Sequence, residues 1–445
     1  MNLKFIHILN NIFSIKTNKL FFLFIVIIGL INSSIIKIPF KILKLNIFKT
    51  DSKEKQIDNM TFYIKLISLI ELGKPLQKIE TIFDLRESNF YITNYCYDCS
   101  YTYLYNKSTT FYKAERGKNQ KNIENSFYAY ESFYFNDGFN NEKKEVKDML
   151  IYLPILNNKN NILNIGLKFP YNINNNFQET FIQQLRHKNI INKYFWIMIF
   201  NDNNKHNKEY DGEFIFGDIV NDYYAYFKDY NSEKIVKIYT GNKKINSKED
   251  IDLEWGILFD EVYYELPKKN ENININKKSN IVNINNLMSE FDFNLNIIYG
   301  TYEYTRNIQR DYFNIYFIKN ICQLTYMRGS IYKYIYCYSS NFTQNDLEAF
   351  PTLYFKIKEL RFIFSLNYKD LFYLTEDKKY YIFNIMMINF YNYENINNDE
   401  LDGVRWIFGL PFWKKYQFSF DTDNKLIYYY NKNGNFKDET KFLLF

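Results

Sequence analysis

Short runs of β-branched and aromatic residues recur along the chain after its first sixty residues or so. In many of these runs apolar and polar positions alternate or apolar residues cluster, as expected for strands that bury one face or both. The clearest are residues 62–70, 195–200, 214–216, 354–364 and 418–430. Helical periodicity is found mainly at residues 177–185. The pattern therefore predicts a mostly β protein with few, short helices.

Three polar stretches interrupt this pattern. Residues 157–161, 242–248 and 268–286 are rich in Asn and Lys. Such stretches offer little apolar surface to bury, so we expect surface loops or disordered insertions there.

The N-terminal region has a different pattern. Residues 1–50 contain no Asp or Glu, and Lys4, Lys16 and Lys19 precede an uncharged apolar run at residues 20–31. This is the layout of a secretory signal, and the run is shorter than the about 20 residues that a membrane span needs. We expect residues 1–34 to be a signal peptide or an uncleaved signal anchor. The remaining alternative is a buried core helix.

Composition narrows the class of protein. The chain has 445 residues, 47% hydrophobic and 24% charged, so it has enough apolar material for two large lobes or about three domains. Its net charge of +6 is small and the basic residues are dispersed, which gives no support to nucleic-acid binding. The chain has only three histidines, so carboxylates are the better candidates for catalytic groups.

Four cysteines form two local pairs, Cys96 with Cys99 and Cys322 with Cys337. Fourteen residues separate the members of the second pair, which is not the short spacing that a zinc ribbon needs. In a chain that enters the secretory pathway, an even number of cysteines favours disulfides. We therefore expect two disulfides that close local loops, and no metal site.

A longer motif surrounds Asp84. A Gly-x-Pro-x-Gln turn at residues 73–77 precedes the hydrophobic run that ends at Asp84, and Ser88, Asn89 and an aromatic residue follow. This segment resembles the start of the first lobe in pepsin-like aspartic peptidases, which reads hydrophobic-Asp-Thr-Gly-Ser-Ser-Asn-aromatic. Residues 96–99 and 107–111 then resemble the small disulfide loop and the Ser-x-Thr-aromatic strand of plasmepsin-type members.

Further blocks follow in the order of the same family. Residues 160–166 resemble its Asp-Gly-Ile-Leu-Gly-Leu-Gly segment, 212–219 the end of its first lobe, 253–257 a Tyr-Trp strand of its second lobe, and 337–355 its Cys-x-x-Leu-Pro-x-Ile-x-Phe region. The most specific block, residues 406–427, is similar to the C-terminal ending of the family. The resemblance extends over residues 60–430.

The resemblance implies a mostly β, bilobal pepsin-like aspartic protease fold with a cleft between two β-rich lobes. It divides the chain into a linker or pro-segment (35–59), an N-terminal lobe (60–218), a C-terminal lobe (219–432) and a tail (433–445). It also implies a monomer without cofactors that holds a peptide or protein in the cleft. Contact with a membrane would come only through an uncleaved N-terminal segment.

By the same resemblance, Asp84 is the first catalytic residue and Asp292, in residues 291–300, is the candidate for its partner. Two carboxylates close together cannot both ionise, so they share one proton. The ionised member activates a water molecule, and the protonated member donates to the peptide carbonyl. The alternative for Asp292 is an incidental acid beside an Asn-rich loop.

Both motifs depart from the family directly after the Asp. Leu85 and Arg86 stand in place of Thr and Gly in the first motif, and Phe293 and Asn294 in the second, so both bracing hydroxyls are lost. A cation about 4 Å from a carboxylate interacts by roughly 4 kcal/mol at an effective dielectric of about 20. Arg86 would therefore hold Asp84 ionised and oppose proton sharing, unless it turns outward to an acidic neighbour.

The flap hairpin of the family has its nearest match at Tyr130, within residues 127–139, which we interpret as strand, turn and strand. Tyr130 is therefore the candidate for covering bound substrate. The flap glycines are missing, and a hairpin without a catalytic role is the alternative.

Two functions follow from the resemblance. The first is an aspartic endopeptidase of the secretory pathway, which the presence of both Asp residues favours. The second is an inactive pseudopeptidase that uses the cleft to bind peptide or protein, which the loss of Thr and Gly in both motifs favours. A structural secreted β protein with an unrelated binding role is a third interpretation.

Overall fold

The computed structural model describes most of the chain between residues 35 and 431. The described ranges are 35–44, 64–88, 90–93, 100–101, 103–114, 126–137, 143–154, 161–168, 179–201, 209–217, 232–235, 240–241, 252–253, 255–265, 287–326, 332–357, 363–375, 377–388, 406–423 and 426–431. The expected signal segment, the expected C-terminal tail, Asn89 and the Cys96–Cys99 pair lie outside these ranges, as do the Asn- and Lys-rich residues 157–160, 242–248 and 268–286.

Strands dominate the described residues, as the sequence pattern predicts. The largest sheet has 13 strands in the order β11-β27-β26-β9-β10-β1-β2-β3-β8-β4-β7-β6-β5. Its strands are β1 (Ile36–Lys44), β2 (Ile64–Leu72), β3 (Gln77–Asp84), β4 (Phe90–Thr93), β5 (Tyr112–Lys113), β6 (Ser126–Asp137), β7 (Lys143–Pro154), β8 (Ile162–Gly166), β9 (Phe195–Phe200), β10 (Gly212–Phe216), β11 (Ser232–Ile235), β26 (Tyr416–Asp421) and β27 (Leu426–Asn431).

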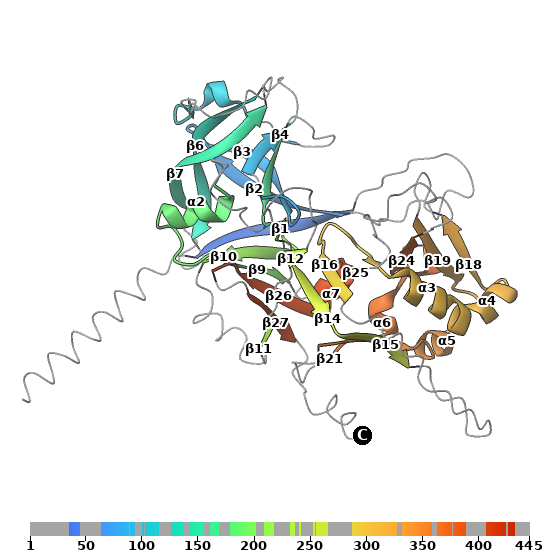
Figure 1. Ribbon diagram of the computed structural model, residues 1–445. Coiled ribbons are helices and arrows are strands. Elements are labelled where there is room, and N and C mark those ends of the chain that lie inside the picture. The colour runs from blue at the N-terminus through green and yellow to red at the C-terminus, as the bar shows by residue number, and fades with distance from the viewer. Residues whose placement is uncertain are drawn as a thin grey trace, which may run out of the picture.

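Part of this sheet closes on itself. Strand β6 pairs with β7 on one side and with β1 and β2 on the other, so that β2, β3, β8, β4, β7 and β6 form a ring. Figure 1 shows this ring at the top and the long strand β1 crossing beneath it to β10 and β9. Residues 36–44, which the sequence analysis assigned to a linker or pro-segment, therefore form a strand of the main sheet.

A second group of sheets is built mainly from residues after 255. A nine-stranded sheet has the order β14-β16-β25-β17-β24-β19-β23-β22, with β18 added on β19. Its strands are β14 (Gly256–Phe259), β16 (Leu287–Phe291), β17 (Ile298–Tyr299), β18 (Cys322–Tyr326), β19 (Tyr332–Tyr338), β22 (Phe372–Leu374), β23 (Tyr380–Phe383), β24 (Ile385–Ile388) and β25 (Trp406–Phe408). Smaller sheets join β15 (Glu261–Glu265), β20 (Thr352–Lys356) and β21 (Ile363–Leu366), and β12 (Thr240–Gly241) with β13 (Asp252–Leu253).

Helices are short. They are α2 (Phe181–His187), α3 (Tyr302–Ile308), α4 (Asn314–Ile318), α5 (Gln344–Glu348), α6 (Tyr368–Leu371) and α7 (Leu410–Lys415), with a π-helical turn η3 (Gln309–Phe313) and a 3-10 turn η2 (Tyr105–Lys107). Helix α2 begins at Phe181 because Thr180 and Gln183 cap each other's backbone amides in a capping box. No helix in the described part of the chain is long and apolar enough to cross a membrane.

The C-terminal strands return to the sheet of the first half. Strand β26 pairs with β9, which places the ring of Phe420 on that of Trp196 with centroids 4.2 Å apart. The indole of Trp255 donates a hydrogen bond to the carbonyl of Leu167 (2.8 Å). Residues on both sides of the expected boundary at 218/219 thus share one sheet and one apolar core.

Three local predictions are corrected by the structure. Residues 354–364 are not one strand, because β20 ends at Lys356 and β21 begins at Ile363. Residues 418–430 are not one strand either, because β26 ends at Asp421 and pairs antiparallel with β27, which begins at Leu426. The turn that we predicted within residues 127–139 is wrong as well, since β6 continues through Ser126–Asp137 with only a bulge between Glu131 and Phe133. A bulge lets a strand absorb an extra residue without reversing its direction.

Candidate functional site

Asp84 is the last residue of β3, at an end where three strands meet. Strand β8 lies between β3 and β4, parallel to β3 and antiparallel to β4, and Asp84 is opposite Gly166. The segment that resembles the Asp-Gly-Ile-Leu-Gly-Leu-Gly motif therefore lies directly beside the segment that carries Asp84. The backbone amide of Arg86 donates to Asp84 Oδ1 (2.8 Å), which holds the carboxylate over its own turn.

Asp292 occupies a matching position in the second half. It follows β16, and β25 lies between β16 and β17, again parallel to the first and antiparallel to the second. Phe291 is opposite Phe408, so Asp292 and Gly409 come next on the two strands. The amide of Asn294 donates to Asp292 Oδ1 (2.9 Å). The chain thus repeats one arrangement, in which an Asp turn joins two strands and a third strand inserts between them.

Arg86 links the two turns. Its Nε is 3.5 Å from Asp84 Oδ1, and its Nη1 is 3.7 Å from Asp292 Oδ2. Because one guanidinium reaches both carboxylates, the structure brings Asp84 and Asp292 together at one place. Arg86 therefore does not turn away from the site to pair with another acid, which was the alternative.

Burial differs between the two carboxylates. The side chain of Asp292 is 10% exposed and that of Asp84 is 22% exposed. Burial raises the pKa of Asp292; the charge of Arg86 and the hydrogen bond from the Asn294 amide oppose this rise, and the charge of Asp84 adds to it. The site therefore contains one carboxyl group that holds its proton more tightly than an exposed Asp.

The guanidinium of Arg86 stays charged in this setting. Burial lowers its pKa, but the charges of Asp292 and Asp84 outweigh that effect and raise the pKa overall. The side chain is 68% exposed, so water screens both contacts and each is worth less than the roughly 4 kcal/mol of an unscreened pair. One cation thus offsets part of the charge of two acids.

The residues that stand in place of Thr in both motifs are buried apolar side chains. Leu85 is 5% exposed and Phe293 is fully buried. The Phe293 ring packs edge-on against Phe214, with centroids 5.7 Å apart, and against Trp413 at 6.0 Å. Apolar packing therefore stands at the two positions where the resemblance led us to compare the chain with a bracing Thr.

Asn294 connects the second turn to the first half of the chain. Its carbonyl accepts a hydrogen bond from the amide of Ile64, the first residue of β2 (2.9 Å). Since β2 pairs with β3, which ends at Asp84, this bond helps to fix the positions of the two Asp turns relative to each other.

Tyr130 lies in the middle of β6, not at a turn. It is opposite Leu150 of β7 and Tyr112 of β5, and its ring stacks on that of Tyr112 with centroids 5.0 Å apart. The loop that joins β6 to β7 lies outside the described residues. Tyr130 therefore lies within a strand, whereas a residue at a flap tip would lie at the bend of a hairpin.

Glu131, the neighbour of Tyr130, was not singled out by the sequence analysis and is fully buried. It accepts hydrogen bonds from the hydroxyl of Tyr103 (2.5 Å), the amide of Ser132 (2.7 Å) and the hydroxyl of Thr110. Burial and this bond to Glu131 raise the pKa of Tyr103. The sequence did contain a signal for this residue, an acid inside the aromatic run 127–135. A carboxylate buried in such a run needs several hydrogen-bond donors.

Of the two expected disulfides, Cys322–Cys337 is confirmed. It joins β18 to β19 at positions that are directly opposite in the strand register. The Cys96–Cys99 pair lies outside the described residues.

A surface hollow of about 180 Å³ lies elsewhere, over strands β1, β2, β3, β6 and β7. Its lining includes Lys37, Lys78, Lys143 and Glu71, but neither Asp84 nor Asp292. The hollow is therefore separate from the candidate site.

No model of a known protein family matches this chain, and a search of curated proteins finds no match either. What the fold and the site define is a mostly β protein in which two matching Asp turns meet around one arginine.

Proposed function

We propose that this protein is a degenerate relative of the pepsin-like aspartic peptidases, with two β-rich lobes, that binds peptide or protein in its cleft and does not hydrolyse it. The observation that carries the proposal is the contact of the Arg86 guanidinium with both carboxylates.

A site of two carboxylates depends on one shared proton. Hydrolysis by this class of site needs one carboxylate to be ionised and the other protonated, so that one activates water and the other donates to the carbonyl. A cation in contact with both favours ionisation of both. Arg86 therefore works against the protonation state that the reaction needs.

Kinship is supported by the repeated strand arrangement. In each half, a strand that ends at an Asp or just before one lies parallel to a strand that ends at a Gly or just before one, Gly166 in the first half and Gly409 in the second. Two such turns that meet are what the resemblance implies for an aspartic peptidase.

The second candidate is an active aspartic endopeptidase. Two features favour it: both carboxylates are present at one site, and the raised pKa of Asp292 keeps a proton available. This candidate requires Arg86 to leave the site when substrate binds, which its 68% exposed side chain would allow.

The deciding experiment measures peptide hydrolysis from about pH 3 to about pH 7. This range covers the titration of ordinary carboxyl groups and of carboxyl groups whose pKa is raised. We expect the wild-type protein and Asp84→Ala to give the same background rate. Binding of a transition-state-mimicking peptide inhibitor, followed by calorimetry, should still occur in both. Turnover that is lost in Asp84→Ala would establish the endopeptidase, and absence of peptide binding would contradict the binding role.

Two further variants sharpen the test. Arg86→Gly removes the bridging cation and places the family's residue at this position, so its inhibitor affinity should become dependent on pH as the carboxylates regain a shared proton. Arg310→Gly is the matched control, because Arg310 is also an exposed arginine in contact with an acid, Asp311, but lies outside the site.

We also propose that the chain enters the secretory pathway and acts as a monomer. The N-terminal apolar segment supports the first point, and so does the Cys322–Cys337 disulfide, because disulfides persist in oxidising compartments.

A further inference from the structure

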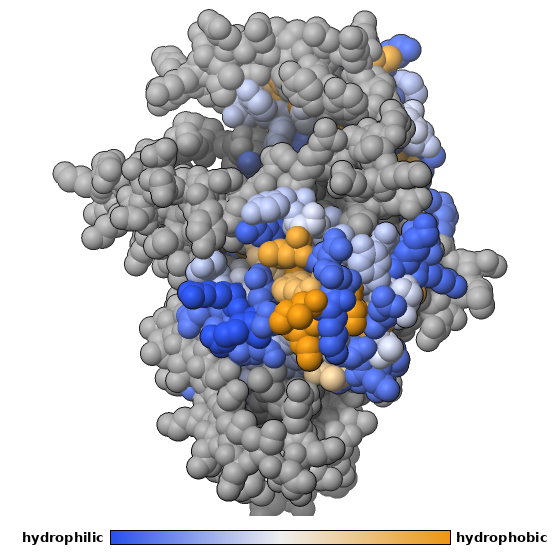
Figure 2. Space-filling view, turned by 90° about the vertical axis from the view of Figure 1, so that its right-hand side faces the viewer, coloured by the Kyte–Doolittle hydropathy of each residue, from blue (hydrophilic) through white to orange (hydrophobic). Residues whose placement is uncertain are grey.

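A compact apolar patch lies on the face of the molecule formed by α4 and β18. Ile315 and Ile318 are 49% and 74% exposed, and Leu324 and Tyr326 are 36% and 53% exposed. Ile315 and Ile318 are three residues apart on a helix, and Leu324 and Tyr326 are two residues apart on a strand, so each pair shares a face. Figure 2 shows apolar atoms gathered in the middle of this side of the molecule with hydrophilic side chains around them. We call these four residues the α4–β18 patch.

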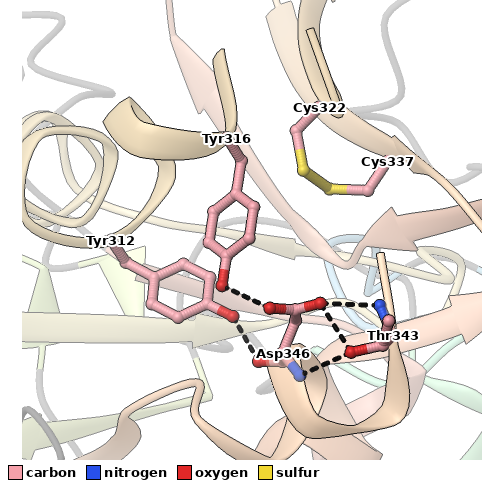
Figure 3. The surroundings of a disulfide bond; sticks show 6 residues. All are labelled: Tyr312, Tyr316, Cys322, Cys337, Thr343 and Asp346. Carbon is pink, nitrogen blue, oxygen red and sulfur yellow. Dashed lines mark hydrogen bonds between the residues drawn. A yellow bond between two sulfur atoms is a disulfide. The ribbon is translucent and has the colours of Figure 1, made fainter. Parts of the chain in front are cut away.

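A disulfide and several hydrogen bonds fix α4 and β18, the elements that carry the patch, to the rest of the protein. The Cys322–Cys337 disulfide joins β18 to β19. Tyr316 of α4 donates its hydroxyl proton to Asp346 Oδ1 (2.9 Å), and Tyr312 donates to the Asp346 carbonyl. Asp346 also accepts from the amide and hydroxyl of Thr343, both at 2.7 Å, at the start of α5 (Figure 3). Because the backbone of α4 and β18 is fixed in this way, the four side chains of the patch remain at the surface.

The segment that carries the patch is basic. Residues 312–345 contain no Asp or Glu and include Lys319 and Lys333, in a chain with 50 acidic residues in 445. Lys319 directly follows α4, and the ammonium group of Lys333 lies 4.6 Å from the centre of the Tyr326 ring. Asp346, the first acid after this segment, accepts hydrogen bonds from Tyr316 and Thr343 and interacts electrostatically with Lys319, so Lys333 is the basic neighbour that contacts the patch itself. Protruding apolar side chains with basic neighbours are complementary to an anionic, partly apolar surface.

We propose that the α4–β18 patch docks the protein on an anionic lipid surface, with Ile315, Ile318 and Leu324 inserted and Tyr326 at the level of the headgroups. A tyrosine has an apolar ring and a polar hydroxyl, which suits it to that boundary. A second copy of the chain fits less well, because a two-fold contact would bring the basic residues of one copy against those of the other. This inference is independent of the proposed function of the Asp84–Asp292 site.

The test uses the full chain and a local readout. Amide hydrogen exchange is measured with vesicles of neutral phosphatidylcholine and with vesicles that also contain about one-third phosphatidylserine. We expect exchange in residues 312–326 to slow by about tenfold on the anionic vesicles and to remain unchanged on the neutral ones. A local readout is needed because the N-terminal apolar segment could bind lipid by itself.

Three variants complete the design. Ile318→Asp should abolish the protection of residues 312–326, because it places a charge at the most exposed position of the patch. Lys319→Gln should weaken vesicle binding through this site about fivefold, the contribution of one cation near an anionic membrane. Leu76→Asp is the control: Leu76 is 49% exposed in the turn between β2 and β3, and its substitution should leave the protection intact.

Three results would each overturn the proposal. The first is exchange in residues 312–326 that is unchanged on anionic vesicles. The second is protection that persists in Ile318→Asp. The third is protection that appears without lipid and rises with protein concentration, because that would identify a second copy of the chain as the occupant.

Discussion

A single side chain, Arg86, changes what two carboxylates can do. Its guanidinium contacts Asp84 at 3.5 Å and Asp292 at 3.7 Å, so three residues form one electrostatic unit. The sequence predicts that Arg86 perturbs Asp84, because the two residues are close in the chain. It does not predict contact with Asp292, which is more than 200 residues away. The direction of the side chain depends on where the second turn lies.

The raised pKa of Asp292 gives a pH dependence of stability. In the folded protein this carboxyl holds its proton more tightly than in the unfolded chain, where its pKa is near 3.8. Its stabilising contribution is therefore complete below about pH 3.8 and is lost as the pH rises through the higher folded-state pKa. In urea unfolding at a series of pH values, Asp292→Asn should remove this loss, so that its free energy of unfolding falls less between pH 4 and neutrality.

Arg86→Ala should have the opposite effect, because it should increase the loss of unfolding free energy as the pH rises. Arg86 lowers the pKa of Asp292, so its removal moves that pKa further upward and extends the loss of stability to higher pH. A pH profile that is the same in wild type and Asp292→Asn would show that Asp292 does not titrate in this way.

At the scale of elements, the recurring unit is an Asp turn between two strands with a third strand inserted. The insertion brings backbones very close together, which explains a glycine after β25. A Cβ atom at Gly409 would overlap the carbonyl oxygens of Ile297 and Leu295. Backbone cannot rotate away as a side chain can, so this position requires Gly.

Gly409→Ala should therefore destabilise the protein by about 3 kcal/mol, at the upper end of the usual cost of overpacking. Gly300→Ala is the matched control. A Cβ atom at Gly300 would meet side-chain atoms of Ile385, Thr305 and Trp406, which can shift, so the cost should be smaller. Free energies of unfolding from urea titration compare the two variants, and equal values would contradict the argument from backbone contact.

At the scale of the whole molecule, aromatic packing joins residues from both halves of the chain. Phe293 of the second Asp turn packs on Phe214 of β10, and Phe420 of β26 stacks on Trp196 of β9. Together with the shared sheet, these contacts couple the two candidate turns to one core. The large number of Phe residues therefore has a structural explanation that needs no ligand.

Phe293→Thr tests this coupling. The substitution removes the buried ring and leaves a cavity between Phe214 and Trp413. We expect it to lower the free energy of unfolding by about 3 to 5 kcal/mol, as for loss of a buried Phe. Circular dichroism and tryptophan fluorescence should report the same unfolding transition. Leu374→Thr, at a 40% exposed position, should change stability by less than about 0.5 kcal/mol. A Phe293→Thr protein as stable as wild type would contradict this packing role.

The sequence by itself determined the elements whose signals are local. Clusters of β-branched and aromatic residues predict strands such as β9 and β27, and the paired spacing of Cys322 and Cys337 predicts their disulfide, because both depend on neighbours in the chain. The resemblance to a family of aspartic peptidases also named Asp84 and Asp292 as candidate partners, without fixing where their side chains lie.

Only the tertiary structure decided what depends on distant residues. It decided that Arg86 reaches both acids, that Tyr130 lies inside a strand, and that Glu131 is buried among the hydroxyls of Tyr103 and Thr110. The physical reason is the same in each case. Side-chain direction, burial and the pKa values of the site depend on strand register and on partners that are far away in the sequence, and neither periodicity nor spacing contains that information.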